Sequence, residues 1–346
     1  MKKENNQQLI SGVDNSYENI RQVIEKARGT AYRAVNFIMV AAYWNIGKII
    51  VEEEQKGKKR ADYGAYLVKI LSSRLTKEYG RGFTQSNLFY MRQFFITFPK
   101  FHALRGELSW THYRALLHIK NKQARDFYTI ECINSRWSTR ELERQINTLL
   151  YERLALSRDK RKVMALSVKG QDIQNPEDII KDPYVLEFLD LPSSYSEKEL
   201  EDRIISNLQM FLLELGKGFS FVARQFRMEI GRRQFYADLV FYNKNLRCYV
   251  LLDLKTGKAC HSDIGQMNLY LNYFKSHVNQ PGDNVPIGII LSGKNNCIEV
   301  KYALGGLDNR IFASKYMLSL PSVEELKKAV EVSRNRIFEK EARERP

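Results

Sequence analysis

Two apolar runs, residues 235–242 and 248–255, constrain the fold of this chain more than any other feature. Only a short break around Asn243-Lys244-Asn245 separates them, so we expect two antiparallel β-strands joined as a hairpin. Each run contains an acidic residue, Asp238 in the first and Asp253 in the second. A carboxylate inside an apolar strand is costly unless something binds it. The hairpin therefore predicts a site that two aspartates share.

Strand geometry predicts which face of the hairpin these acidic residues occupy. Side chains alternate between the two faces of a strand, so Asp253 and Lys255 point to one face and Leu254 to the other. If the strands pair, Asp238 joins them, and two close carboxylates repel each other unless a cation lies between them. Oxygen ligands suit Mg²⁺ or Mn²⁺. Lys255 would then orient or help deprotonate an attacking water and stabilise negative charge on a phosphate, as in metal-assisted hydrolysis of nucleic acid.

The ordered set of residues resembles the PD-(D/E)XK nuclease superfamily, whose core has an acid on a first helix, an aspartate on one strand and Asp/Glu-X-Lys on the next. Glu201, Asp238 and Asp253-Leu254-Lys255 match this order, with Ala237 at the position of the motif's proline. The surrounding sequence is similar to bacterial YhcG-type nucleases over nearly the whole chain. The segments that carry this similarity are Leu212-Leu213-Glu214-Leu215-Gly216, Val222-Ala223-Arg224-Gln225, Phe241-Tyr242, Gly265-Gln266-Met267-Asn268-Leu269-Tyr270 and Pro286-Ile287-Gly288-Ile289-Ile290-Leu291.

The resemblance implies an α/β restriction-endonuclease-like domain in the C-terminal half, preceded by an all-α domain. It implies that Asp238 and Asp253 hold the metal ion with help from the Leu254 carbonyl, and that Lys255 acts on water and phosphate. Glu201 would support the site or a second ion.

Three further residues take their expected roles from the resemblance alone: Gln266 in the catalytic set, and Arg224 and Tyr270 in contact with nucleic acid. Plainer interpretations stay open. Gln266 and Tyr270 are one helical turn apart, which a solvated Gln and a buried Tyr explain equally well. Glu201 follows the helix cap Ser196, where acids are favoured by the helix dipole. A lone Asp-X-Lys is usually a solvated pair at a strand end.

Composition agrees with a two-domain protein that binds a polyanion. The chain has 346 residues, 44% of them hydrophobic, with a net charge of +15, and its pI is about 9.5. No apolar run approaches the roughly 20 residues of a membrane span; the best covers residues 37–43. The first eight residues lack the apolar stretch of a signal peptide. We therefore expect a cytoplasmic protein with no membrane partner.

Cysteine and histidine usage excludes other kinds of site. The four cysteines show no CxxC spacing and the five histidines form no metal-binding motif, so neither a zinc site nor a disulfide framework is expected. His261 follows Cys260, but adjacent side chains rarely aim at one another, and we assign it no catalytic role.

The N-terminal half is expected to be helical and to bind nucleic acid. Residues 1–160 hold 28 Lys+Arg against 16 Asp+Glu, a net charge of +12. Apolar spacings of three and four predict helices over residues 17–54 and 66–79. Further helices are expected to begin at Thr84, near Ser109 and at Ser138, the last with a capping-box sequence.

Residues 63–98 are a helix-turn-helix candidate, because only a short glycine-containing segment separates two predicted helices. Gln85 and Asn87 would lie in the first turn of a recognition helix, with Arg81 and Arg92 contacting phosphate. A plain helical hairpin in a bundle explains the same pattern.

The predicted organisation is therefore a basic helical domain over residues 1–158, a linker over 159–183, a nuclease domain over 184–321 and a charged C-terminal helix over 322–346. The nuclease domain is expected to follow the order α-β-β-β-α-β with further strands. Its elements are a helix at 197–215, a strand at 219–230, the hairpin, a helix at 263–275 and strands at 287–291, 298–302 and 312–318, followed by a tail helix at 323–341.

We expect a Mg²⁺- or Mn²⁺-dependent nuclease that cuts nucleic acid, with DNA as the expected substrate, in DNA processing, recombination or defence. The main alternative is a DNA-binding or partner-recruiting protein whose nuclease fold does not cut; the intact set of four acidic and basic groups favours the enzyme. An RNA-binding protein is a third interpretation, although the chain lacks a stacking motif of the RNP type. The sequence leaves the oligomeric state, the strandedness of the substrate and endonuclease versus exonuclease action open.

Overall fold

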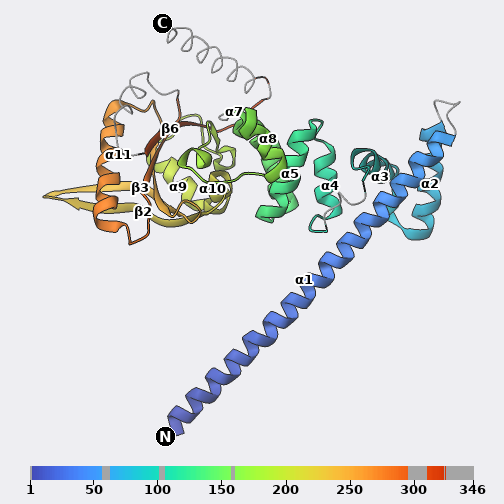
Figure 1. Cartoon of the computed structure of the whole chain (residues 1–346), viewed down its shortest axis with the longest axis horizontal. Coiled ribbons are helices and arrows are strands. Elements are labelled where there is room, and N and C mark those ends of the chain that lie inside the picture. The colour runs from blue at the N-terminus through green and yellow to red at the C-terminus, as the bar shows by residue number, and fades with distance from the viewer. Residues whose placement is uncertain are drawn as a thin grey trace. The chain divides into compact units, whose positions relative to one another are not determined.

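A computed structural model describes residues 2–56, 63–100, 106–156, 160–294, 310–322 and 324. The chain divides into two compact units, Met1–Arg125 and Asp126–Pro346 (Figure 1). By contacts the chain thus divides earlier than residue 158, and the sequence boundary expected there stays a prediction. The first unit carries 22 Lys+Arg against 10 Asp+Glu, so the +12 excess expected of the N-terminal half lies entirely within it.

The first unit is helical, as expected. Its elements are α1 (Lys2–Lys56), α2 (Tyr63–Tyr79), the 3₁₀ turn η1 (Arg81–Phe83), α3 (Gln85–Thr97) and α4 (Trp110–Leu117). Ile50 of α1 packs with Val68 of α2 and with Leu88 and Met91 of α3. Gly47 lies where α1 meets α3 so closely that a Cβ atom would clash with the carbonyl oxygen of Met91. The core of this unit is therefore built on the C-terminal part of α1.

By length and composition alone, one described helix could cross a membrane, namely α1 over Ser16–Lys56. Part of its apolar surface is covered by protein, because four of its apolar residues are buried inside the helical unit: Val40, Trp44, Ile50 and Val51. The expectation that the protein has no membrane partner stays a prediction.

The second unit takes in the helices α5 (Lys122–Ser135, apart from its first turn), α6 (Thr139–Asn147), α7 (Leu150–Leu156) and α8 (Lys160–Lys169). Buried ion pairs join these helices to the domain that follows. Glu214, which is fully buried, binds Arg144 of α6 at 3.2 Å and Arg153 of α7 at 2.6 Å. Burial lowers the pKa of the neighbouring Lys181 to about 8, while Glu214 opposes that shift. Because these charges are buried together, the helices fold with the sheet domain.

The expected linker is also structured. Residues 160–169 form α8, and a 3₁₀ turn follows at Pro176–Ile179. Gln171, Asp178, Ile179 and Lys181 are all buried. The polar composition that suggested a linker instead supplies hydrogen bonds, such as the one from Gln171 Nε2 to the carbonyl oxygen of Asp178 (2.9 Å).

A six-stranded mixed sheet forms the centre of the second unit, with strand order β1-β6-β5-β4-β3-β2. The pairs β2–β3 and β3–β4 are antiparallel, and the remaining pairs are parallel. The strands are β1 (Tyr184–Val185), β2 (Phe219–Ile230), β3 (Arg233–Asn243), β4 (Cys248–Lys255), β5 (Ile287–Ser292) and β6 (Arg310–Met317). The hairpin and the strands expected near 219, 287 and 312 are confirmed. The strand expected at 298–302 and the helix at 323–341 lie outside the described residues, apart from Glu324.

Helices cover both faces of the sheet (Figure 1). On one face, α9 (Glu197–Ser206) and α10 (Leu208–Leu215) contribute Leu200 and Phe211 to a core with Leu239 and Leu252. On the other face, α11 (His261–Tyr273), followed by a π-helical turn at Phe274–Val278, packs against Val240. The single helix expected over 197–215 is wrong in one respect, because the chain breaks at Asn207, which has a φ of −118° and ψ of 33°.

Candidate active site

The two aspartates of the sequence motif meet where β3 and β4 part. The ladder between these strands ends at the pair Leu239–Leu252, and the next residues of the two strands are Asp238 and Asp253. The two carboxyl groups are close enough for the charge of Asp238 to raise the pKa of Asp253. The main-chain N–H of Leu254 donates to Asp238 Oδ2 at 2.8 Å, so a carboxylate takes the place of a strand partner there. The N–H and C=O of one strand residue point to the same side. The Leu254 carbonyl therefore also faces Asp238.

Asp253 is a buried carboxyl group with a strongly shifted pKa. The residue is 3% exposed, and its Oδ2 lies 2.9 Å from Nζ of Lys255. Burial raises the pKa of Asp253 to about 7, Lys255 opposes the shift and the charge of Asp238 adds to it. Burial alone would lower the pKa of Lys255, but Asp253 outweighs this effect and raises it. Lys255 is therefore a cation at neutral pH.

Glu201 reaches the same region from α9, where it is buried. Arg224 of β2 forms an ion pair with Glu201 through Nε and with Asp202 through a terminal nitrogen (2.5 Å). Gln225 Nε2 donates to Glu201 Oε2 (2.5 Å) and to Asp238 Oδ1 (3.2 Å). One amide thus links the acid of the helix to the acid of β3.

Gln225 reaches both carboxylates through an unusual backbone conformation. Strand β2 carries a bulge between Phe221 and Ala223, and Gln225 has a φ of +49°. Such a φ is uncommon for a residue other than glycine, and residues of this kind concentrate at functional sites. An open pocket of about 350 Å³ lies beside the residue, lined by Glu197, Lys198, Glu201, Arg224, Gln225 and Asp238.

The other residues expected to act in this domain are Tyr270, Gln266 and Arg224, and each has a partner within the protein. Tyr270 is 2% exposed and belongs to the core under α11, so the plainer interpretation of a buried tyrosine fits it better than contact with nucleic acid. Its hydroxyl accepts a hydrogen bond from Gln266 Nε2 at 2.5 Å. Burial raises the pKa of Tyr270, and the charges of Asp253 and Asp238 add to this effect. Arg224 is paired with two carboxylates, and its expected contact with nucleic acid stays a prediction.

In the first unit, the start of α3 agrees with the helix-turn-helix candidate, since Thr84 caps the helix by accepting from the N–H of Asn87. Arg81 and Gln85 are exposed. Asn87 is half-buried: its side chain donates to the carbonyl oxygen of Gly82 (2.5 Å) and accepts from Trp110 Nε1 (3.0 Å).

Arg92 also has a partner within the unit. Its Nε binds both carboxylate oxygens of Glu54, at 2.9 and 2.7 Å. Asn87 and Arg92, two of the four nucleic-acid contacts expected in this unit, therefore stabilise the helical bundle in this structure. Sequence-specific reading by the first turn of α3 stays a prediction.

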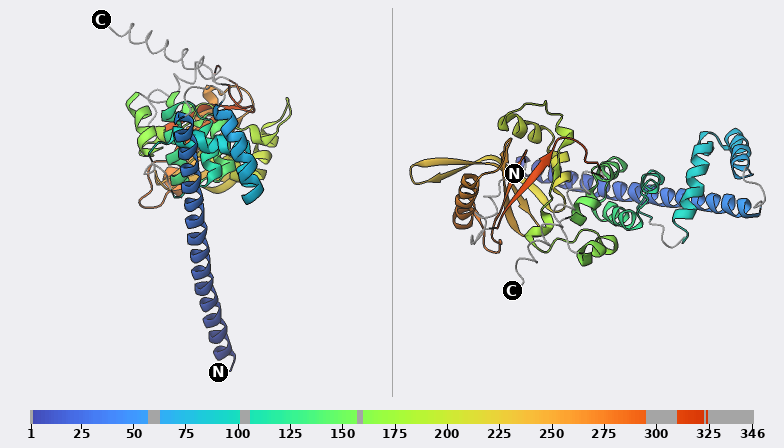
Figure 2. Two further views of the ribbon diagram at one scale, coloured as in Figure 1. Left: turned by 90° about the vertical axis from the view of Figure 1, so that its right-hand side faces the viewer. Right: turned by 90° about the horizontal axis from the view of Figure 1, so that it is seen from above.

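Sequence reasoning assigned no role to two features near the site. The first is Gln225, for which the only signal was its place beside Arg224 in a segment shared with the YhcG-type nucleases. The second is the far end of the β2–β3 hairpin, which projects beyond the sheet (Figures 1 and 2) and carries exposed Arg227, Arg232 and Arg233. The arginines were visible in the sequence, but the projection of the hairpin was not.

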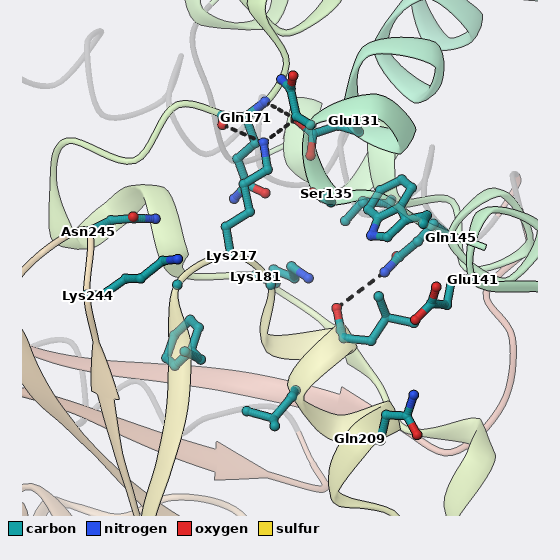
Figure 3. A pocket seen from close by; sticks show the side chains of 18 residues that line it. Glu131, Ser135, Glu141, Gln145, Gln171, Lys181, Gln209, Lys217, Lys244 and Asn245 are labelled. Carbon is teal, nitrogen blue, oxygen red and sulfur yellow. Dashed lines mark hydrogen bonds and ion pairs between the residues drawn. The ribbon is translucent and has the colours of Figure 1, made fainter. Parts of the chain in front are cut away.

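A second cavity, of about 520 Å³, lies between α5–α6 and the start of β2. Figure 3 shows Lys217 pointing toward Glu131 and Gln171. Its Nζ lies 2.8 Å from Glu131 Oε1 and 3.1 Å from the carbonyl oxygen of Gln171. Glu131 also accepts from the N–H of Gln171. The charges here serve to join the helices to the sheet domain.

The donor set around Asp238 and Asp253 fits a divalent cation. Within the described ranges, no three His, Cys, Asp or Glu side chains lie together as a ready metal cluster, and Glu201 is engaged by Arg224 and Gln225. Two carboxylates and a backbone carbonyl nevertheless supply hard oxygen ligands. A buried carboxyl whose pKa is raised to about 7 is also a group that a nearby cation would stabilise in its ionised form.

Comparison with known proteins agrees with the fold and the motif. Residues 177–331 match the family described as YhcG PDDEXK nuclease domain, and residues 19–153 match the DUF1016 N-terminal domain. Fold and motif thus define a PD-(D/E)XK nuclease-type domain of restriction-endonuclease-like architecture that follows a helical region. The chain is 40% identical to the protein YhcG of Escherichia coli (strain K12) over 348 residues, which cover 91% of this chain and 93% of that protein. It belongs to the YhcG family of PDDEXK nucleases.

Two solved structures are similar to part of the chain. A repair endonuclease from Pyrococcus abyssi shares 21% identity, covering 38% of this chain and 50% of that one with a TM-score of 0.27. The structure of EndoMS with double-stranded DNA shares 19% identity, covering 38% and 48% of the two chains with a TM-score of 0.28.

Proposed function

We propose that this protein is a divalent-metal-dependent nuclease that hydrolyses phosphodiester bonds in DNA. The observation that carries the proposal is the buried Asp253, paired with Lys255 and placed beside Asp238 where β3 and β4 part. Mg²⁺ or Mn²⁺ bound there would polarise the phosphate and lower the pKa of a water. We place this activity in the cytoplasm, in DNA processing, recombination or defence.

Different residues of the chain would bind that ion and stabilise charge on the phosphate. Asp238 and Asp253 would hold it, with the Leu254 carbonyl beside them. Because the pKa of Lys255 is raised, we assign Lys255 the role of a cation that stabilises the negative charge developing on the phosphate. Since the pKa of Asp253 is about 7, binding of a cation should release a proton near neutral pH.

DNA is the substrate that the charge distribution favours. The first unit holds +12 of the net charge of +15, which suits a polyanion. In the second unit, Arg227, Arg232 and Arg233 lie on the projecting hairpin that leads back along β3 to Asp238. Such a hairpin offers phosphate contacts next to the catalytic centre.

One observation favours the alternative of a DNA-binding protein that does not cut. Glu201 is engaged by Arg224 and Gln225, so it would have to leave these partners before it could assist a metal ion. Asp253 is paired instead with Lys255 of the same motif, the group that would act on the phosphate, which is why we rank the nuclease first.

The test is cleavage by the full chain of circular duplex, circular single-stranded and linear DNA, and of RNA of equal length. Mg²⁺, Mn²⁺ and a chelator would be compared, and circular substrates separate endonuclease from exonuclease action. Lys255→Ala should lower the rate by about 10²–10³-fold, the loss typical when a charge-stabilising group is removed. Lys258→Ala removes an exposed lysine three residues away and should keep the activity. Tight DNA binding by the unaltered protein without cleavage under any condition would establish the alternative.

A further inference from the structure

Between residues 17 and 38, α1 exposes several large apolar side chains, of which four lie along one line and Val23, Tyr32 and Val35 lie outside it. Tyr17 is 64% exposed, Ile20 59%, Ile24 45% and Ile38 63%. Among the described residues, fully buried positions of α1 begin at Val40, and the half-buried Phe37 lies beside Gly106. Figures 1 and 2 show α1 extending well beyond α2, α3 and α4 of its own unit. An apolar line of this length on a single helix is rarely left in water.

The spacing of these residues identifies the kind of surface that covers them. The line continues through three exposed alanines, at positions 27, 31 and 34. Positions 17, 20, 24, 27, 31, 34 and 38 are separated by alternating steps of three and four residues. This is the heptad repeat of a coiled coil, whose period of 3.5 residues keeps the line facing a second helix that winds around the first.

We propose that this segment of α1 forms a parallel coiled coil with the same segment of a second copy of this chain. The seam, defined as these seven positions, spans about 33 Å of helix. A seam of identical residues is self-complementary, as a symmetric pair requires.

The residues that flank the seam agree with a parallel pair. Arg21 and Arg28 flank it on one side, each within 3.5 Å of a glutamate of its own helix. The other side carries the uncharged Val23 and Thr30. In a parallel coiled coil, each flank faces the opposite flank of the partner, so arginine meets valine or threonine. An antiparallel pair would bring arginine flanks together.

A lipid bilayer is a poorer occupant of the same surface. The face of α1 away from the seam carries Glu18, Glu25, Lys26 and Arg33 within the exposed segment. A spanning helix would have to bury these charges in hydrocarbon. A partner helix covers only the seam and leaves them in water.

The experiment measures the molar mass of the full chain in solution by light scattering, over concentrations up to tens of micromolar. One chain has a mass of 40.5 kDa. The unaltered protein should have at least twice that mass, and the triple variant Ile20→Glu, Ile24→Glu, Ile38→Glu should have the mass of one chain. A control of equal charge, Asn19→Glu, Gln22→Glu, Tyr32→Glu, alters exposed residues outside the seam and should keep the assembly.

A cysteine variant tests the register. Ile24→Cys should form an intermolecular disulfide on oxidation, because identical seam positions lie opposite each other in a parallel pair; Gln22→Cys should not. A monomeric unaltered protein, or an assembly that survives the triple seam variant, would overturn the proposal. So would a monomer that floats with anionic phospholipid vesicles only when the seam is intact, because the occupant would then be a membrane.

Discussion

Replacing Asp253 with asparagine should stabilise the ion-free protein, and the gain should grow as the pH rises. Asp253 is 3% exposed, and its pKa is raised from 3.8 to about 7, chiefly by burial. A carboxyl whose pKa is raised on folding contributes stability below its unfolded-state pKa and loses it as the pH rises through the folded-state value. Asparagine resembles the protonated carboxyl at every pH.

The magnitude follows from the size of the shift. A difference of about 3 pKa units corresponds to roughly 4 kcal/mol between the ionised and protonated forms once the pH exceeds about 7. Because the unfolded chain is already mostly ionised at pH 5, the part gained between pH 5 and pH 8 is about 2.5 kcal/mol. The free energy of unfolding of Asp253→Asn minus that of the unaltered protein should increase by this order across the interval.

The assay is denaturant unfolding in the presence of chelator at pH 5 and pH 8. Glu229→Gln, which removes an exposed carboxylate on β2, is the control and should show little dependence on pH. At pH 8, millimolar Mg²⁺ should stabilise the unaltered protein but not Asp253→Asn, which should also lose cleavage. An equal difference at both pH values would refute the assignment of Asp253 as a buried, costly charge, and cleavage at the unaltered rate would refute its role as a ligand.

Two further predictions concern the first unit. Asn87→Ala should cost about 1–2 kcal/mol in thermal unfolding, because it breaks contacts with Gly82 and Trp110, whereas the exposed Gln85→Ala should cost little; equal effects would contradict this placement. A fragment of residues 1–125 should bind DNA with an affinity that falls steeply with salt in a mobility-shift titration, and residues 126–346 should bind more weakly. Salt-independent binding by the first fragment would contradict an electrostatic origin.

The sheet and the catalytic pair could be predicted because their signals are local. The alternation of strand residues placed Asp253 and Lys255 on one face, and they form an ion pair. The short break near Asn243 made the hairpin the simplest connection, and that register brings Asp238 beside Asp253. The burial that shifts the pKa of Asp253 could not be predicted, since it depends on how α11 and the neighbouring strands pack.

The domain boundary depends on contacts that leave no local signal. In the sequence, Arg144 and Arg153 look like ordinary charged helix residues. Both nevertheless bind Glu214, which lies 70 positions after Arg144 and 61 positions after Arg153. A buried carboxylate needs such partners, and removing them would leave a charge without compensation. For this reason α6 and α7 pack with the sheet domain, although the match to the helical N-terminal family extends over residues 19–153.

The contacts of Gln225 suggest why the two acidic residues Glu201 and Asp238 keep a fixed separation. Glu201 comes from α9 and Asp238 from β3, two elements that nothing in the sequence motif holds at a fixed separation. The Gln225 amide binds both carboxylates, and it does so from a backbone φ of +49°, a conformation that costs about 1 kcal/mol or more. Two hydrogen bonds to charged acceptors offset that cost. Gln225 is therefore best understood as the residue that couples the helix acid to the strand acid, a role that sequence order alone does not reveal.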